Sequence, residues 1–144
     1  MREIDVSIIE SAVEKLFISA NAELPHSLEN LIRESQKSET NETAKNIFCD
    51  MCKNLSLARE NEIPICQDTG MAVLFIEVGQ DVHFVGGSLN NAINNGVKKA
   101  YLDGKMRCSI VKDPIHRGNT NDNTPALVHY SIVDGDKVKI AVCP

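Results

Sequence analysis

Tryptophan is absent from this 144-residue sequence, and aromatic residues make up only 4% of it. Few side chains are therefore available to stack on nucleic-acid bases. The formal net charge is -5 at pH 7, so no overall positive field attracts nucleic acid or an anionic membrane. No apolar run approaches the roughly 20 residues that a membrane span needs. These absences argue against a nucleic-acid-binding or membrane-spanning protein.

The cysteine pattern does not resemble a disulfide framework. The sequence has five cysteines, an odd number, without the spacing of small disulfide-rich scaffolds. Residues 1–5 include acidic side chains where a secretory signal would have a basic region. We therefore expect a cytoplasmic protein. The length is sufficient for one domain with its own core, and neither a repeat nor a low-complexity linker divides it, so we predict a single domain over residues 1–144.

Residues 1–62 have the periodicity of helices. The first apolar face has helical spacing and consists of Ile8, Ile9, Ala12, Val13, Leu16, Phe17 and Ala20. Ser7 and Glu10 fit a capping box, with Asp5 as a competing N-cap. A shorter stripe follows Pro25, and a third apolar face lies between Ala44 and Ala58. We expect all three faces to belong to the core.

Residues 63–144 mix strand and helix patterns. Residues 71–78 form an apolar run typical of a strand buried on both faces, 82–85 a short strand and 88–104 a helix that Gly104 terminates. Residues 107–111 also predict a strand, and 126–133 with 137–142 predict a hairpin around a turn at 134–136. The expected fold is α+β: an N-terminal layer of about three helices packed with a mainly antiparallel sheet and one further helix.

Cys66 lies in the most distinctive segment, Pro-Ile-Cys-Gln-Asp-Thr-Gly at residues 64–70. Pro64 and Gly70 favour a tight connection between the preceding helix and the following strand, and such loops often carry functional residues. A polar turn with a cysteine in a small pocket is an equally simple interpretation. A protease-like pair of Cys66 with His129 has nothing to orient the histidine, which fits a structural residue better.

Other motifs are weaker. Cys49 and Cys52 have CxxC spacing on a predicted helix, but no second ligand pair accompanies them, so a metal or redox role is the minority interpretation. No serine nucleophile elbow, Walker-type loop, dinucleotide fingerprint or His-Glu-x-x-His helix is present. Arg107 and Arg117 could bind small carboxylates, or could equally be solvated charges.

Several strings together resemble the class I, iron–sulfur-dependent fumarate hydratases and the related L(+)-tartrate dehydratase alpha subunits. They are residues 64–70, Ala-Ile-Asn-Asn-Gly-Val at 92–97, Asp-Pro at 113–114, Arg-Gly-Asn-Thr at 117–120 and Asp-Asn-Thr-Pro-Ala at 122–126. Their order and spacing fit the N-terminal half of the alpha region.

The resemblance implies a hydro-lyase that hydrates fumarate or dehydrates tartrate. In this family three cysteines hold a [4Fe-4S] cluster whose open iron acts as a Lewis acid, and Cys66 matches the first of the three. Gln67 and Asp68 match groups on the substrate side, with Asp68 as the catalytic candidate, and Arg107 matches an arginine that holds a substrate carboxylate. The loop at residues 119–124, with Thr120 and Asp122, and also His129 match positions for which we expect only a shaping role.

The resemblance also defines what this chain does not carry. The other two cluster cysteines, a glycine-rich segment and a separate beta region belong to other polypeptide in the family, so we expect the 144 residues alone to be inactive. The expected partners are a small dicarboxylate, the remainder of the alpha region and the beta region, in an oligomer. Two alternatives stay open: a non-catalytic domain that binds small dicarboxylates or serves assembly, and a thiol redox module using Cys49 and Cys52. The sequence does not separate fumarate from tartrate.

Overall fold

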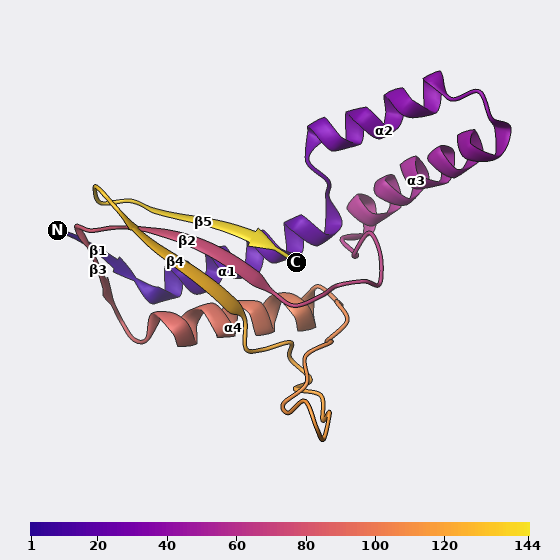
Figure 1. Ribbon diagram of the computed structural model, residues 1–144. Helices are drawn as coiled ribbons and strands as arrows, with labels where there is room; N and C mark the ends of the chain where they lie inside the picture. The colour runs from indigo at the N-terminus through magenta and orange to yellow at the C-terminus, as the bar shows by residue number, and fades with distance from the viewer.

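The computed structural model describes residues 1–144 as four helices and five strands (Figure 1). In chain order they are β1 (Arg2–Asp5), α1 (Val6–Ala22), α2 (His26–Ser38), α3 (Glu42–Asn61), β2 (Val73–Gly79), β3 (Val82–Val85), α4 (Leu89–Asp103), β4 (Leu127–Val133) and β5 (Val138–Cys143). The α+β class and the count of four helices are therefore confirmed. No helix combines the length and the apolar character needed to cross a membrane.

The main sheet has three strands in the order β4-β2-β5. β2 is central because its apolar run packs on the helices and both its edges accept a partner; Leu74 and Ile76 are buried. β4 runs parallel to β2, with Leu74 opposite Val128, and β5 runs antiparallel to it, with Leu74 opposite Val142. A separate two-stranded sheet pairs β1 with β3 in parallel.

Two predictions about the sheet are wrong. The main sheet has one parallel and one antiparallel pairing, and the separate β1–β3 pair is parallel, so the strands are not mainly antiparallel. β4 and β5 also do not pair with each other as a hairpin, because β2 lies between them. The connection at residues 134–137 crosses the end of β2, where Gly79 N donates to Lys137 O at 2.8 Å and Gln80 N donates to Val133 O at 2.8 Å. The apolar central strand therefore takes both partners, a long-range pairing that turn chemistry alone does not reveal.

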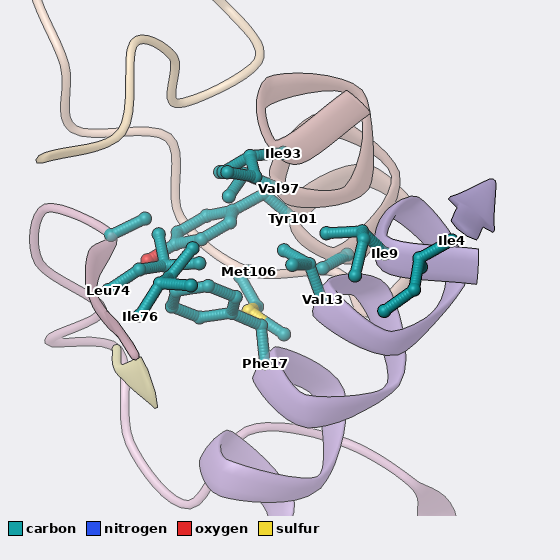
Figure 2. Packing of buried hydrophobic residues seen from close by; sticks show 12 residues of the cluster. Ile4, Ile9, Val13, Phe17, Leu74, Ile76, Ile93, Val97, Tyr101 and Met106 are labelled. Carbon is teal, nitrogen blue, oxygen red and sulfur yellow. The ribbon is translucent and has the colours of Figure 1, made fainter. Parts of the chain in front are cut away.

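The core lies between the sheet and the pair of helices α1 and α4 (Figure 2). Asp5 is the N-cap of α1, since its carboxylate accepts from Ser7 N at 2.8 Å. Phe17 of α1 and Tyr101 of α4 are fully buried, with ring centroids 6.1 Å apart. The helices approach closely at Gly96, where a Cβ would lie 2.5 Å from the Glu10 carbonyl oxygen. This packing holds the end of α4, and with it one side of the candidate site, on a rigid base.

The hairpin of α2 and α3 projects from this body instead of joining the helical layer (Figure 1). Its apolar faces were expected in the core, yet Leu31 is 58% and Ile47 57% exposed. Glu29 joins the two helices: its carboxylate accepts from Arg33 Nη2 at 2.7 Å and from Arg59 Nη2 at 2.6 Å. The prediction that all three N-terminal helical faces are core is therefore wrong, because α2 packs mainly on α3.

Residues 107–111 do not form the predicted strand. They contribute only an isolated bridge between Val111 and Asn119. Side chains, not a neighbouring strand, bind this backbone: Asn119 Nδ2 donates to Cys108 O at 2.8 Å, and the Asn123 side chain accepts from Ser109 N at 2.7 Å. Local amide groups thus replace a sheet ladder. The division of the chain into domains stays a prediction.

Substituting Gly96→Ala should destabilise the fold. The new methyl group would contact the Glu10 carbonyl and the Val13 side chain at 2.5 and 3.0 Å, and the backbone of α1 cannot yield as a flexible side chain would. We expect a loss of about 1–3 kcal/mol in the free energy of unfolding, reduced by the better helix propensity of alanine. Urea denaturation measures it. Gly118→Ala is the control, because a methyl group added there would meet no atom within 4 Å; an equal effect in both variants would contradict the close approach.

Glu29 should make the stability of the α2–α3 hairpin depend on pH. Its hydrogen bonds from Arg33 and then Arg59 hold the pKa of the Glu29 carboxyl below its usual value. The ionised form therefore stabilises the folded chain above the ordinary Glu pKa of about 4.3 and ceases to do so as the pH falls through the lower folded value.

We expect Glu29→Gln to be less stable than the wild type at pH 7 and to approach it below about pH 4 in urea titrations. Glu34→Gln is the control, since Glu34 is an exposed side chain of α2 without an ion pair. A difference between wild type and Glu29→Gln that does not change with pH would contradict the role of the carboxylate.

Candidate active site

Cys66 follows the end of α3 on a bend that two neighbouring helices hold. Glu62 ends α3 with a left-handed backbone, φ 50°, and Ile63 N donates back to Ala58 O at 3.1 Å. Ile65 N donates to Asn21 O at 2.9 Å, and Asn54 Nδ2 donates to Ile65 O at 2.8 Å. The residue before Cys66 is therefore fixed on both backbone groups. Cys66 itself is exposed, so its thiol is presented from a held backbone.

The opposite wall of the site is the segment that leaves α4. Met106 N donates to Tyr101 O at 2.9 Å, and the Met106 side chain is buried in the core. Lys105 and Arg107 on either side of it are exposed. Lys105 and Arg107 are thus exposed on either side of Met106, whose buried side chain anchors this segment in the core.

These two segments line an open pocket of about 440 Å³, which we call the Cys66 pocket. Its lining consists of Ile63, Pro64, Ile65, Cys66, Gln67, Lys105, Met106 and Arg107. The structure thus brings three predicted site residues, Cys66, Gln67 and Arg107, to one pocket. Asp68 is exposed and does not line it. No acidic side chain is among the lining residues, so the pocket is suited to an anion.

Hydrogen bonds tie the two walls together below the pocket. Thr69, which is 3% exposed, donates from Oγ1 to Arg107 O at 2.9 Å. Ser109 Oγ donates in the opposite direction to Thr69 O at 3.2 Å, and Tyr101 OH donates to Gly70 O at 3.2 Å. Thr69 is therefore held against the segment around Arg107 by two hydrogen bonds, and Gly70 is held to α4 by a third.

Asn123 completes this connection and is fully buried. Its Oδ1 accepts from Ser109 N at 2.7 Å and from Ile110 N at 3.2 Å, while its Nδ2 donates to Gly70 O at 3.0 Å. Its backbone has φ 58°, a left-handed conformation that asparagine tolerates better than most residues. We expected a shaping role for the loop at 119–124, but the sequence did not indicate which residue carries it.

Asp122 and His129 lie outside the Cys66 pocket. Although burial raises the pKa of the Asp122 carboxyl, its hydrogen bonds from the Thr124 hydroxyl and amide, and then the Lys98 ammonium, bring the pKa below its usual value. His129 stacks on Phe75 of the sheet, with ring centroids 4.9 Å apart. Thr120 is half-buried. The shaping role expected for these three residues stays a prediction.

The remaining cysteines are not gathered at the pocket. All five are free, and no group of three or more Cys, His, Asp or Glu side chains is placed to hold a metal ion. Cys52 is buried, with its Sγ 3.8 Å from Gln36 Oε1, and burial raises the pKa of the Cys108 thiol. Cys66 is the only cysteine that lines the pocket.

Lys105 is a pocket residue that the sequence interpretation missed. It lies in the turn after α4 with φ 55°. The available signal was its spacing, two positions before Arg107 with an apolar residue between them. That signal is weak without the structure, because a lysine near a helix C-terminus is common for electrostatic reasons.

Comparison with known proteins identifies the family. The family described as fumarate hydratase (Fumerase) matches residues 10–144. This chain belongs to that family. A Methanocaldococcus jannaschii protein provisionally named L(+)-tartrate dehydratase subunit alpha is 32% identical over 80% of this chain. The anaerobic class I fumarate hydratase of Escherichia coli K12 is 32% identical over 70% of it, and the L(+)-tartrate dehydratase subunit alpha of E. coli O157:H7 is 27% identical over 83%.

The chain corresponds to only part of these relatives. The matched region covers 40% of the M. jannaschii protein and 40% of the E. coli O157:H7 subunit, but 19% of the E. coli K12 fumarate hydratase. The Cys66 pocket therefore lies in a chain that spans less than half the length of the relatives it matches.

Substituting Asn123→Ala should destabilise the fold strongly. The change removes two acceptor contacts and one donor contact in a fully buried position, leaving the Ser109 amide and the Gly70 carbonyl without this partner. We expect a loss of about 3 kcal/mol or more, measured by urea denaturation.

Asn121→Ala is the matched control for this substitution. Asn121 also has a left-handed backbone, φ 64°, but it is exposed and its side chain makes no hydrogen bond. Both variants lose the tolerance of asparagine for that conformation, so the difference between them reports the buried amide. Equal destabilisation would mean that backbone strain, not hydrogen bonding, explains Asn123.

Proposed function

We propose that this chain is the N-terminal part of an iron–sulfur hydro-lyase that hydrates fumarate to malate or dehydrates tartrate. Membership of the fumarate hydratase family supports the reaction class. The observation that carries the proposal is the Cys66 pocket, in which Cys66, Gln67 and Arg107 line one cavity without an acidic neighbour in the lining. A soft sulfur donor and a carboxylate-binding cation thus meet at the same place.

The residues present fit a single-ligand contribution to an iron–sulfur cluster. Clusters are held by cysteine thiolates, and Cys66 is an exposed thiol on a fixed backbone. With no second ligand group beside it, the chain would hold the cluster through Cys66 alone, and the other ligands would come from further polypeptide. When bound, the cluster supplies Lewis-acid stabilisation of the oxygen that is added or removed as water.

The chain's own contribution is to bind and orient the dicarboxylate. The Arg107 guanidinium makes no ion pair or hydrogen bond within the chain, so its planar fork is free to hold a carboxylate in a bidentate geometry. The Gln67 amide offers a donor and an acceptor at the wall next to Cys66. Asp68 remains our candidate for orienting the hydroxyl group; it is exposed beside the pocket, and association with further polypeptide would have to enclose it.

Partners follow from the same proposal. The relatives named as alpha subunits indicate an assembly with a beta subunit, and the match to part of each relative indicates further alpha polypeptide. We propose that both are needed for turnover. Cys66, Gln67, Lys105 and Arg107 are all exposed although they line the Cys66 pocket, which leaves room for an additional wall.

A non-catalytic dicarboxylate-binding domain is the second candidate. It is favoured by the absence of any three-ligand group in the 144 residues and by the two uncompensated cations of the pocket. The two candidates differ in whether the sulfur of Cys66 is required. A thiol redox module would instead use Cys49 and Cys52, of which Cys52 is buried and both are free thiols; a reversible change in thiol count after oxidation would be its signature.

Substituting Cys66→Ser should abolish hydration in the full assembly. Co-expression of this chain with the remaining alpha and beta regions should give a brown, oxygen-sensitive protein, and Cys66→Ser should lose both iron and fumarate consumption because serine lacks the thiolate. Iron content, visible absorbance and fumarate loss are the measurements.

Cys143→Ser is the matched control, an exposed free cysteine on β5 away from the pocket. It should keep iron and activity. Wild-type hydration by Cys66→Ser would refute the ligand role, and a colourless, metal-free wild-type assembly that still hydrates fumarate would refute the iron–sulfur mechanism.

A further inference from the structure

Lys105 lines the Cys66 pocket together with Arg107, and no role for it follows from the family resemblance. Its backbone is well fixed: Lys105 N donates to Leu102 O at 3.3 Å, and the next amide, of Met106, donates to Tyr101 O at 2.9 Å. The buried Met106 side chain then separates two exposed cations. Lys105 and Arg107 therefore reach the same cavity from one rigid strip of backbone.

Neither cation is neutralised within the chain. The side chains of Lys105 and Arg107 make no ion pair and no hydrogen bond, whereas Lys98, Lys99 and Lys139 each lie within 4 Å of a carboxylate. The acidic residues nearest in sequence to the opposite wall, Glu62 and Asp68, do not line the pocket. In a chain of net charge -5, two adjacent free cations in a cavity make a local anion site.

The charge of this strip matches a dianion better than a monoanion. Arg107 can bind one carboxylate through two parallel N–H···O contacts, which fixes its orientation. A lysine ammonium is a compact point charge on a flexible stem, and it can follow a second carboxylate without such directional demands. The C-terminal end of α4 also favours a cation at Lys105, but that preference does not require the side chain to line a cavity.

We propose that Lys105 is a second substrate-binding residue, which neutralises the far carboxylate of a dicarboxylate whose other carboxylate Arg107 holds. This inference rests on the proposed function and deepens it, because it assigns selectivity for dicarboxylates over monocarboxylates to this chain. Both charged ends of the ligand are then bound by the 144 residues, without the cluster.

Calorimetric titration of the 144-residue chain at low ionic strength tests the proposal. Succinate is the probe, since it is a saturated dicarboxylate that cannot be hydrated, and butyrate is the monocarboxylate of the same length. Lys105→Met should weaken succinate binding about fivefold, as expected for one exposed charge pair, and leave butyrate binding unchanged. Arg107→Met should weaken both, and added salt should reduce the effect of Lys105.

Two further variants make the test specific. Lys105→Arg keeps the charge and should keep succinate binding even if the methionine variant is less stable, which circular dichroism would reveal. Lys37→Met is the matched control, because Lys37 is also a lysine at the C-terminal end of a helix, α2, but lies outside the pocket. Unchanged succinate binding in Lys105→Met, or no succinate binding by the wild type, would overturn the proposal.

The outcome is separable from that of the proposed function. If Cys66→Ser abolishes hydration in the assembly but Lys105→Met binds succinate normally, the hydro-lyase stands and the role of Lys105 falls. If the succinate result holds but Cys66→Ser is fully active, the pocket binds dicarboxylates and the ligand role of Cys66 falls.

Discussion

The buried amide of Asn123 is the interaction on which the candidate site depends. It binds the backbone on both sides: Ser109 and Ile110 amides at Oδ1, and the Gly70 carbonyl at Nδ2. No strand pairing joins these two segments, so a side chain supplies the contacts that a sheet would supply elsewhere. Buried polar groups that are fully satisfied specify one arrangement, because any shift would leave a donor or acceptor unpaired. The spacing between Cys66 and Arg107 follows from this link.

Much of the local structure was accessible from the sequence. Helical periodicity located four helices, and the apolar run at residues 71–78 located β2. The prediction that this strand is buried on both faces is wrong, because Leu74 and Ile76 are buried but Phe75 on the other face is 48% exposed. The resemblance singled out Cys66, Gln67 and Arg107, which the structure places in one pocket. These features succeeded because each depends on a short stretch of chain, or on strings specific enough to be recognised together.

The predictions that were wrong concern features that depend on contacts between residues far apart in the sequence. The β4-β2-β5 order depends on whether a strand prefers its sequence neighbour or the apolar β2, and period alone does not distinguish the two. The exposed faces of α2 and α3 have the same periodicity as core faces, since periodicity reports amphipathicity and not the partner that covers it. Residues 107–111 have strand-like composition but take their hydrogen bonds from asparagine side chains. Lys105 was missed because its place in the lining of the Cys66 pocket depends on the turn after α4, which the sequence pattern does not specify.

The charge distribution explains how an acidic chain can present an anion site. The net charge of a protein determines its electrostatic field far from the surface. Salt screens that field over about 10 Å at 0.1 M ionic strength. Within the Cys66 pocket the relevant charges are those of the lining, and these are Lys105 and Arg107 alone. Some carboxylates elsewhere are paired within the chain: Glu29 with two arginines, Glu10 with Lys99 and Glu77 with Lys139. Because neither of these two cations has an ion pair within the chain and no acidic residue lines the pocket, this cavity is positive beside an exposed thiol although the chain as a whole is acidic.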